Sequence, residues 1–327
     1  MKVITSNDMN IIPANPSSIT TARPLSPEVE ALMRNSRASA TLRAYRSDWA
    51  GFEAFCSAIG VQALPAVPST VAEYVAHLSA TCKASTIGRK VASISTAHKT
   101  AGYTSPCTNE TVLATLKGMR REKTVVTRKV APVRVANLRA AFEVVASDPT
   151  DIRNRALLLI GYAGGFRRSE LVGLDLSDIE KTNEGLVVTL RRSKTDQAGA
   201  GHRKGIPYGS NPSTCPVRAL GAWLALLGET TGPVFRRIRK GAKITGDRLS
   251  DQSVCLIVKE MAPALGLDAA SVGGHSMRAG FVTDAYAVGA PEAAIMATTG
   301  HKSHAVMTGY RREANLFRQN AAAMVGL

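Results

Sequence analysis

Six residues of this chain have the types that transfer of a phosphodiester bond needs when no metal takes part. Guanidinium groups can neutralise the charge that grows on the non-bridging phosphate oxygens. A histidine and a lysine can move protons, and a tyrosine hydroxyl can attack as the nucleophile. The six residues are, in chain order, Arg167, Lys194, His275, Arg278, His301 and Tyr310. Their types predict acid–base chemistry on a phosphate, with Tyr310 as the nucleophile.

The first of these residues, Arg167, follows an apolar run and the pair Gly164-Gly165. Glu170 comes three positions later, so on a helix the two side chains share a face. An ion pair on a solvated helix is the ordinary reading of this spacing. The glycines and the apolar run favour instead a partly buried arginine that another group approaches closely.

The second pair, His275 and Arg278, has the same three-residue spacing and follows Gly273-Gly274, which can start a helix. A histidine at a helix start is usually a cap or a surface group. A histidine beside an arginine on one face, however, can bind the oxygens of one phosphate and exchange protons with it.

The last pair, His301 and Tyr310, is nine residues apart. At roughly 100° per residue, one continuous helix would place the two side chains on opposite faces. A shared site therefore requires a break, for which Gly300, Ser303 and Gly309 are suitable. The alternative for Tyr310 is a packing aromatic whose hydroxyl is hydrogen-bonded.

The composition favours a polyanionic partner. Lys and Arg number 41 against 25 Asp and Glu, a net charge of +16, which favours nucleic acid or an anionic membrane surface. Met1–Asn10 has no apolar leader, and the apolar stretch 156–166 is too short to span a bilayer. The sequence thus predicts a cytoplasmic protein without a membrane partner.

No metal or other cofactor is predicted. A metal-dependent nuclease would need clustered Asp and Glu ligands, and no such cluster is near the six residues. The cysteines are scattered, odd in number and without a CxxC pair, which indicates reduced thiols and no zinc site. They are Cys56, Cys82, Cys107, Cys215 and Cys255.

Residue patterns divide the chain into four parts. Residues 1–25 are polar and predict a flexible tail, and 26–119 predict a helical domain. Its helices are expected to start at Ser39–Thr41, Pro68-Ser69, Ser85-Thr86 and Asn109. The basic segment 120–134 is interpreted as a linker that crosses a phosphate backbone. In the second domain, 135–327, we expect helices over 135–146 and 151–174, strands over 185–190 and 202–208, and helices to the end.

The ordered set Arg…Lys…His-x-x-Arg…His…Tyr resembles the tyrosine recombinases, the phage-integrase family. The Gly-x-Arg-x-Ser-Glu-Leu box around Arg167 and the nine-residue step from His301 to Tyr310 are also typical of it. The resemblance extends from about residue 26 and is greatest to Cre-type recombinases. It implies a mainly α fold with a small β-sheet, in a two-domain, C-shaped DNA clamp.

The resemblance also implies roles for the matching positions. Arg167 and Arg278 would hold the scissile phosphate, with Glu170 supporting the site. His275 would mediate proton transfer, and His301 would donate a hydrogen bond to the phosphate. Lys194 would protonate the departing 5′ oxygen, with Arg191, Arg192 and Lys204 of the same hairpin as alternatives. Tyr310 would form a 3′-phosphotyrosine without metal or ATP. A C-terminal apolar helix would dock into a neighbouring subunit; its stripe is Leu316, Phe317, Met324 and Val325.

The implied partner is double-stranded DNA with inverted repeats, bound by a homotetramer on two sites and exchanged through a Holliday junction. The helix near Ser250 would enter the major groove with Gln252, a residue that pairs naturally with adenine. Ordinary caps and solvated charges are the alternative for the contact candidates. These candidates are Thr41, Arg43, Ser85, Thr86, Arg89, Lys90, Arg120, Arg121, Ser250 and Gln252.

Other functions use the same features in part. A type IB topoisomerase or a telomere resolvase shares much of this site. A DNA-binding regulator without catalysis would lack one of the catalytic residues, and none is missing here. A basic protein that coats DNA would not require Tyr310.

Overall fold

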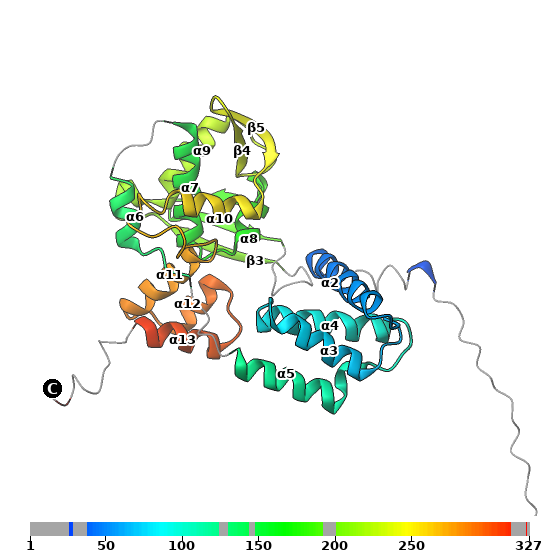
Figure 1. Ribbon diagram of the computed structural model, residues 1–327. Coiled ribbons are helices and arrows are strands. Elements are labelled where there is room, and N and C mark those ends of the chain that lie inside the picture. Colours follow the sequence, from blue (N-terminus) through cyan, green and yellow to red (C-terminus); the bar gives the residue numbers. More distant parts are fainter. Residues whose placement is uncertain are drawn as a thin grey trace, which may run out of the picture. The chain divides into compact units, whose positions relative to one another are not determined.

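The computed structural model describes residues 26–28, 38–123, 130–143, 148–191, 201–314 and 325. The chain forms two compact units, Met1–Val126 and Thr127–Leu327 (Figure 1). The division falls inside the segment 120–134 that was predicted to be a linker. Each unit has its own hydrophobic core.

The described part of the first unit is helical. Its apolar residues recur at helical spacing and meet in one core that includes Phe52, Tyr74 and Ile94. Trp49, Phe55 and His98 add ring contacts around this core. The helices are α2 (Ser39–Ala58), α3 (Pro68–Ser79), α4 (Ala84–Thr100), the short η1 (Pro106–Thr108) and α5 (Glu110–Glu122).

All four predicted helix starts in this unit are confirmed to within one residue, but the side-chain cap predicted at Ser39–Thr41 is wrong. Helix α3 begins at Pro68, and the Asn109 side chain accepts a hydrogen bond from Thr111 N at 2.9 Å to cap α5. Helix α2 begins at Ser39 after Ala38, and α4 begins at Ala84 after Lys83, neither with a side-chain cap. The Ser and Thr residues predicted as caps therefore lie inside the first turns.

The second unit combines helices with two small antiparallel sheets. The three-stranded sheet has the order β1-β2-β3, and β4 pairs with β5. Its elements are α6 (Val135–Ala141), α7 (Pro149–Ala163), α8 (Arg168–Gly173), η2 (Leu176–Asp178), β1 (Ile179–Lys181), β2 (Gly185–Leu190), β3 (His202–Pro207), η3 (Pro212–Thr214), α9 (Pro216–Leu227), β4 (Arg236–Arg239), β5 (Lys243–Arg248), α10 (Asp251–Glu260), α11 (Ser276–Ala287), α12 (Glu292–Thr299) and α13 (His304–Ala314).

The strand pair over 185–190 and 202–208 is confirmed as β2 and β3, the latter ending at Pro207. The helix predicted over 151–174 is wrong. It is two helices, α7 and α8, because the chain turns at Gly164-Gly165, where Gly165 has a φ of 53°. The segment after 208 also contains the hairpin β4–β5, where helices alone were expected.

Helix α7 is central to the second unit. Ala156–Ile160 is fully buried against the surrounding elements, and α7 contacts both α9 and α11. A buried helix of this kind holds the turn that follows it at a fixed position. In the described residues no helix is long and apolar enough to cross a membrane.

Candidate active site

The turn between α7 and α8 presents Arg167. Arg167 is the residue just before α8. The carboxylate of Glu170, in the first turn of α8, accepts hydrogen bonds from the backbone N–H of Arg167 (2.9 Å) and from Arg167 Nη1 (2.5 Å). Glu170 is 5% exposed, so the pair is not the solvated ion pair that the spacing alone allowed. Burial by itself would raise the pKa of Glu170, but the hydrogen bonds from Arg167 lower it below its ordinary value.

Arg278 lies in the first turn of α11 and is 1% exposed. Its Nη1 donates to the carbonyl oxygens of Gly165 (2.7 Å) and Thr299 (2.5 Å). Its Nη2 is buried and has no hydrogen-bond partner among the described residues. Burial, and then the charge of Arg167, lower the pKa of Arg278 to about 10. A buried donor without a hydrogen-bond partner destabilises the folded chain, and an anion bound at Nη2 would remove this destabilisation.

His301 and Tyr310 come together because the chain breaks between them, as predicted. Helix α12 ends at Thr299, Gly300 has a φ of 68°, and α13 begins at His304. The two ring centroids are 6.3 Å apart. Burial lowers the pKa of His301 to about 4, helped by Arg278, Arg167, His275 and Lys204 in that order.

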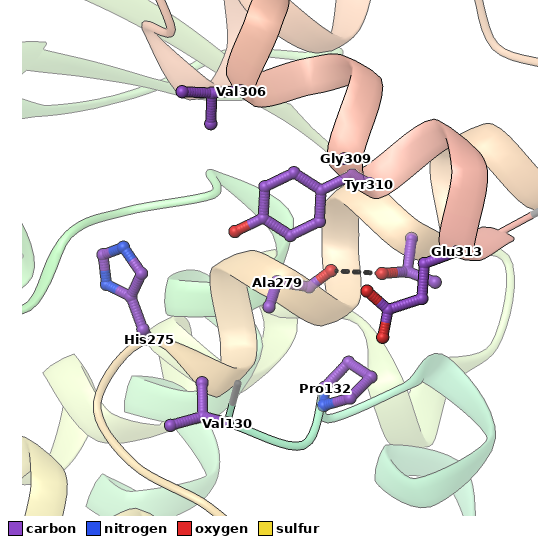
Figure 2. Close-up of a pocket in the computed structure, with 9 residues that line it drawn as sticks. Val130, Pro132, His275, Ala279, Val306, Gly309, Tyr310 and Glu313 are labelled. Carbon is purple, nitrogen blue, oxygen red and sulfur yellow. Dashed lines mark hydrogen bonds between the residues drawn. The ribbon is translucent and has the colours of Figure 1, made fainter. Parts of the chain in front are cut away.

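A pocket of about 340 Å³ joins His275 to Tyr310. Figure 2 shows the Tyr310 hydroxyl pointing toward the side of the pocket where His275 lies. Helices α11 and α13 and the segment 130–132 form its walls. The lining residues are Val130, Pro132, His275, Ala279, Thr283, Val306, Gly309, Tyr310 and Glu313.

Lys204, one of the alternatives to Lys194 in the same hairpin, lies in the site. It is 4% exposed, its Nζ donates to the Gly164 carbonyl at 2.8 Å, and it lies 4.6 Å from the centroid of the Phe166 ring. Burial lowers its pKa to about 8, although Glu170 opposes the shift. The two-residue alternation of side chains along β3 could have indicated that Lys204 is buried, because Lys204 lies on the same face of the strand as the buried Ile206.

Some predicted functional residues cannot be placed. Lys194 lies outside the described residues, as does the expected C-terminal apolar helix apart from Val325, which is exposed. The five residues Arg167, His275, Arg278, His301 and Tyr310 are all described. His275 and Tyr310 line one pocket. Electrostatic effects link Arg278 to Arg167 and Tyr310, and link His301 to Arg278, Arg167 and His275, so the five residues lie in one site.

The predicted DNA-contact residues occupy two regions, one in each unit. In the first unit Arg43, Ser85, Arg120 and Arg121 are exposed, and Arg89 and Lys90 form ion pairs with the buried Asp48. The remaining candidates there, Thr41 and Thr86, are half-buried.

In the second unit Ser250 caps α10 by accepting from Ser253 N at 3.1 Å. Gln252 is exposed in the first turn of that helix. Just before α10, the β4–β5 hairpin has exposed cations that were not among the predicted contact residues. They are Arg237, Arg239, Lys240 and Lys243.

All five cysteines are free thiols. Within the described residues, no group of three or more His, Cys, Asp and Glu side chains is arranged to hold a metal ion. The site as described consists of arginine, lysine, histidine and tyrosine side chains with one buried carboxylate.

Comparison with known proteins identifies similar chains and folds. The model of the phage integrase family matches residues 133–316. An integrase/recombinase XerD homologue from Selenomonas ruminantium is 36% identical over 301 residues, covering 91% of this chain and 88% of that protein. Because this relative is of the Xer type, the finer resemblance to Cre-type recombinases stays a prediction.

Two solved structures share the fold. The Tn1549 transposon integrase, in complex with transposon right-end DNA, is 15% identical with a TM-score of 0.60, covering 89% of this chain and 97% of that one. A lambda integrase dimer bound to a core site is 19% identical with a TM-score of 0.58, covering 86% and 92%.

Proposed function

The chain belongs to the phage integrase family, and we propose that it is a site-specific DNA recombinase that uses Tyr310 as its nucleophile. The observation that carries this proposal is the buried Nη2 of Arg278, a donor without a described partner in the site that contains Tyr310. An arginine in this state favours an anionic ligand. A phosphate bound there would be held within reach of a tyrosine hydroxyl.

In the proposed reaction the Tyr310 oxygen forms a bond to phosphorus while the bond from phosphorus to the 5′ oxygen breaks. Arg167 and Arg278 neutralise charge on the non-bridging oxygens. His275 takes the tyrosine proton, and Lys194 gives a proton to the departing oxygen. The 3′-phosphotyrosine retains the energy of the phosphodiester, so attack by a second 5′ hydroxyl rejoins strands without ATP.

The proposed partner is double-stranded DNA. The net charge of +16 supports it, as do the DNA complexes of the two integrases similar in fold. We further propose that residues 26–119 are a core-binding domain and residues 135–327 the catalytic domain. A homotetramer would hold two sites with inverted repeats and exchange strands through a Holliday junction.

The exposed cations of the first unit and the start of α10 are proposed to contact this DNA, mostly at phosphates. Arg89 and Lys90 form ion pairs with Asp48, and this carboxylate would offset part of the positive charge that they present to the phosphates. The exposed cations of the β4–β5 hairpin would add to the same phosphate contacts.

A cleavage assay with a nicked duplex tests the proposal. The duplex would be the sequence that the purified chain selects from a random library, with a nick that lets the cleaved strand diffuse away. We expect a covalent protein–DNA adduct on a denaturing gel, formed equally well in EDTA. Cleavage that needs a divalent ion, or DNA binding with no adduct, would contradict the proposal.

A further inference from the structure

Thr299, the last residue of α12, links three parts of the site. It is 1% exposed, and its carbonyl oxygen accepts from Arg278 Nη1 at 2.5 Å. Its methyl group packs on Gly165, where an added Cβ would lie 2.8 Å from Cγ2. Its hydroxyl contacts the Ile295 carbonyl oxygen and His301 Nδ1, each at 2.7 Å.

The single proton of the Thr299 hydroxyl determines which ring nitrogen of His301 is protonated. A hydroxyl has one proton, and a carbonyl oxygen can only accept. The proton of Oγ1 is therefore used in the bond to Ile295, and His301 Nδ1 must be the donor in the other contact. In a neutral ring, Nε2 then has a free lone pair.

The surroundings of His301 keep the ring neutral before phosphate binds. Cationic or titratable groups face it from the turn after α7 (Arg167), from β3 (Lys204) and from α11 (His275 and Arg278). Tyr310 faces it from α13. Burial and these groups together lower its pKa to about 4. A neutral ring with Nδ1 protonated cannot donate to a phosphate through Nε2.

We propose that Thr299 is a positioning residue that fixes His301 as the Nδ1–H tautomer, so that His301 enters the reaction as a proton acceptor at Nε2. This inference rests on the proposed function. When the anionic phosphate binds, Nε2 takes up one proton from solvent. The resulting imidazolium donates through Nδ1 to Thr299 and through Nε2 to the phosphate. His301 is thus a phosphate ligand only after one proton has been taken up.

Histidine nitrogen NMR tests the tautomer without DNA. The full chain would be labelled with ¹⁵N-histidine, and the His301 signals identified by their absence in His301→Gln. Near pH 7 we expect a protonated Nδ1 and an unprotonated Nε2. Thr299→Val has nearly the same shape but no hydroxyl, and should shift His301 toward the Nε2–H form. Thr299→Ser retains the hydroxyl and should retain the wild-type pattern.

A wild-type His301 with a protonated Nε2 would overturn the proposal, and so would an Nδ1–H tautomer that persists in Thr299→Val. Circular dichroism melting of both variants separates these outcomes from unfolding. Because the spectra require neither DNA nor cleavage, failure of the proposed recombinase function would leave the tautomer result standing.

Proton uptake links the tautomer to DNA binding. Calorimetry near pH 6.5, in buffers of different ionisation enthalpy and with the selected duplex, should show about one more proton taken up by wild type and Thr299→Ser than by Thr299→Val. The adduct rate of the wild type should fall from pH 6 to pH 8, whereas that of Thr299→Val should be flatter. Equal proton uptake and parallel pH profiles in all three proteins would contradict the role of Thr299.

Discussion

Lys204 and Gly164 are joined by a 2.8 Å hydrogen bond from the buried amine to the carbonyl oxygen at the end of α7. The next carbonyl oxygen, on Gly165, accepts from Arg278 at 2.7 Å. Two cations from different elements thus hold consecutive peptide groups of the turn that presents Arg167. The sheet and α11 both determine where this arginine lies.

Replacing Lys204 by Met should affect catalysis more than stability. The variant leaves the Gly164 carbonyl without its donor, a cost of about 1–3 kcal/mol, but it also removes a buried charge, which offsets much of that cost. We expect the free energy of unfolding to change by about 1 kcal/mol or less, and adduct formation to slow roughly tenfold as Arg167 shifts. Denaturant titration and single-turnover cleavage measure the two effects. Lys181→Met, exposed at the end of β1, is the control; equal rates for both variants would exclude this role of Lys204.

Replacing Arg278 by Lys should abolish most cleavage while DNA binding changes little. Arg278 uses Nη1 for two carbonyl oxygens and keeps Nη2 for a ligand, and one ammonium cannot reproduce this fork. Loss of such a preorganised donor costs on the order of 10²–10³ in rate. Rapid-quench cleavage and filter binding distinguish rate from affinity. Arg218→Lys on α9 controls for the substitution itself, and a rate within about threefold of wild type would contradict the assignment.

Acid should destabilise the protein partly through His301. Its pKa is lowered from 6.5 to about 4 in the folded chain, so between these values the unfolded chain binds more protons. Stability therefore rises with pH across that window and is lost as pH falls through it. The melting temperature of the wild type should drop more steeply from pH 6.5 to 4 than that of His301→Gln. Parallel curves would mean that His301 is not buried in its neutral form.

Helix α11 packs so closely against the backbone at Val133 that position 280 must be a glycine. A Cβ at Gly280 would lie 1.7 Å from the Val133 carbonyl oxygen, and backbone cannot move aside as a side chain can. Gly280→Ala should lower the free energy of unfolding by about 3 kcal/mol or more. Gly246→Ala, in open space in β5, is the control for thermal melting. A Gly280→Ala protein that melts with the wild type would show that α11 can shift without cost.

Local signals in the sequence predicted part of the fold and site. Pro68 and Asn109 determine helix starts through contacts within a few residues, and Gly300 breaks the helix between His301 and Tyr310. These features depend on neighbours in the chain. The contact between Arg167 and Glu170 followed from their three-residue spacing for the same reason, although Arg167 precedes α8 and the pair is buried.

Features that depend on distant packing were not predictable in this way. The turn at Gly164-Gly165 interrupts a continuous apolar pattern, so the sequence indicated one helix. Lys204 is buried because β3 packs beneath that turn, and a lysine in a strand ordinarily indicates an exposed edge. The cationic β4–β5 hairpin lacks an alternating apolar pattern, so no periodicity marked it.

Mapping the covalent adduct by mass spectrometry tests the nucleophile most directly. Protein trapped on the nicked duplex would be digested with nuclease and protease, and the nucleotide-bearing peptide sequenced. We expect the modification on Tyr310, and no adduct from Tyr310→Phe, which keeps the ring packed beside His301. An adduct on another residue, or one that survives Tyr310→Phe, would contradict the assignment of Tyr310 as the nucleophile.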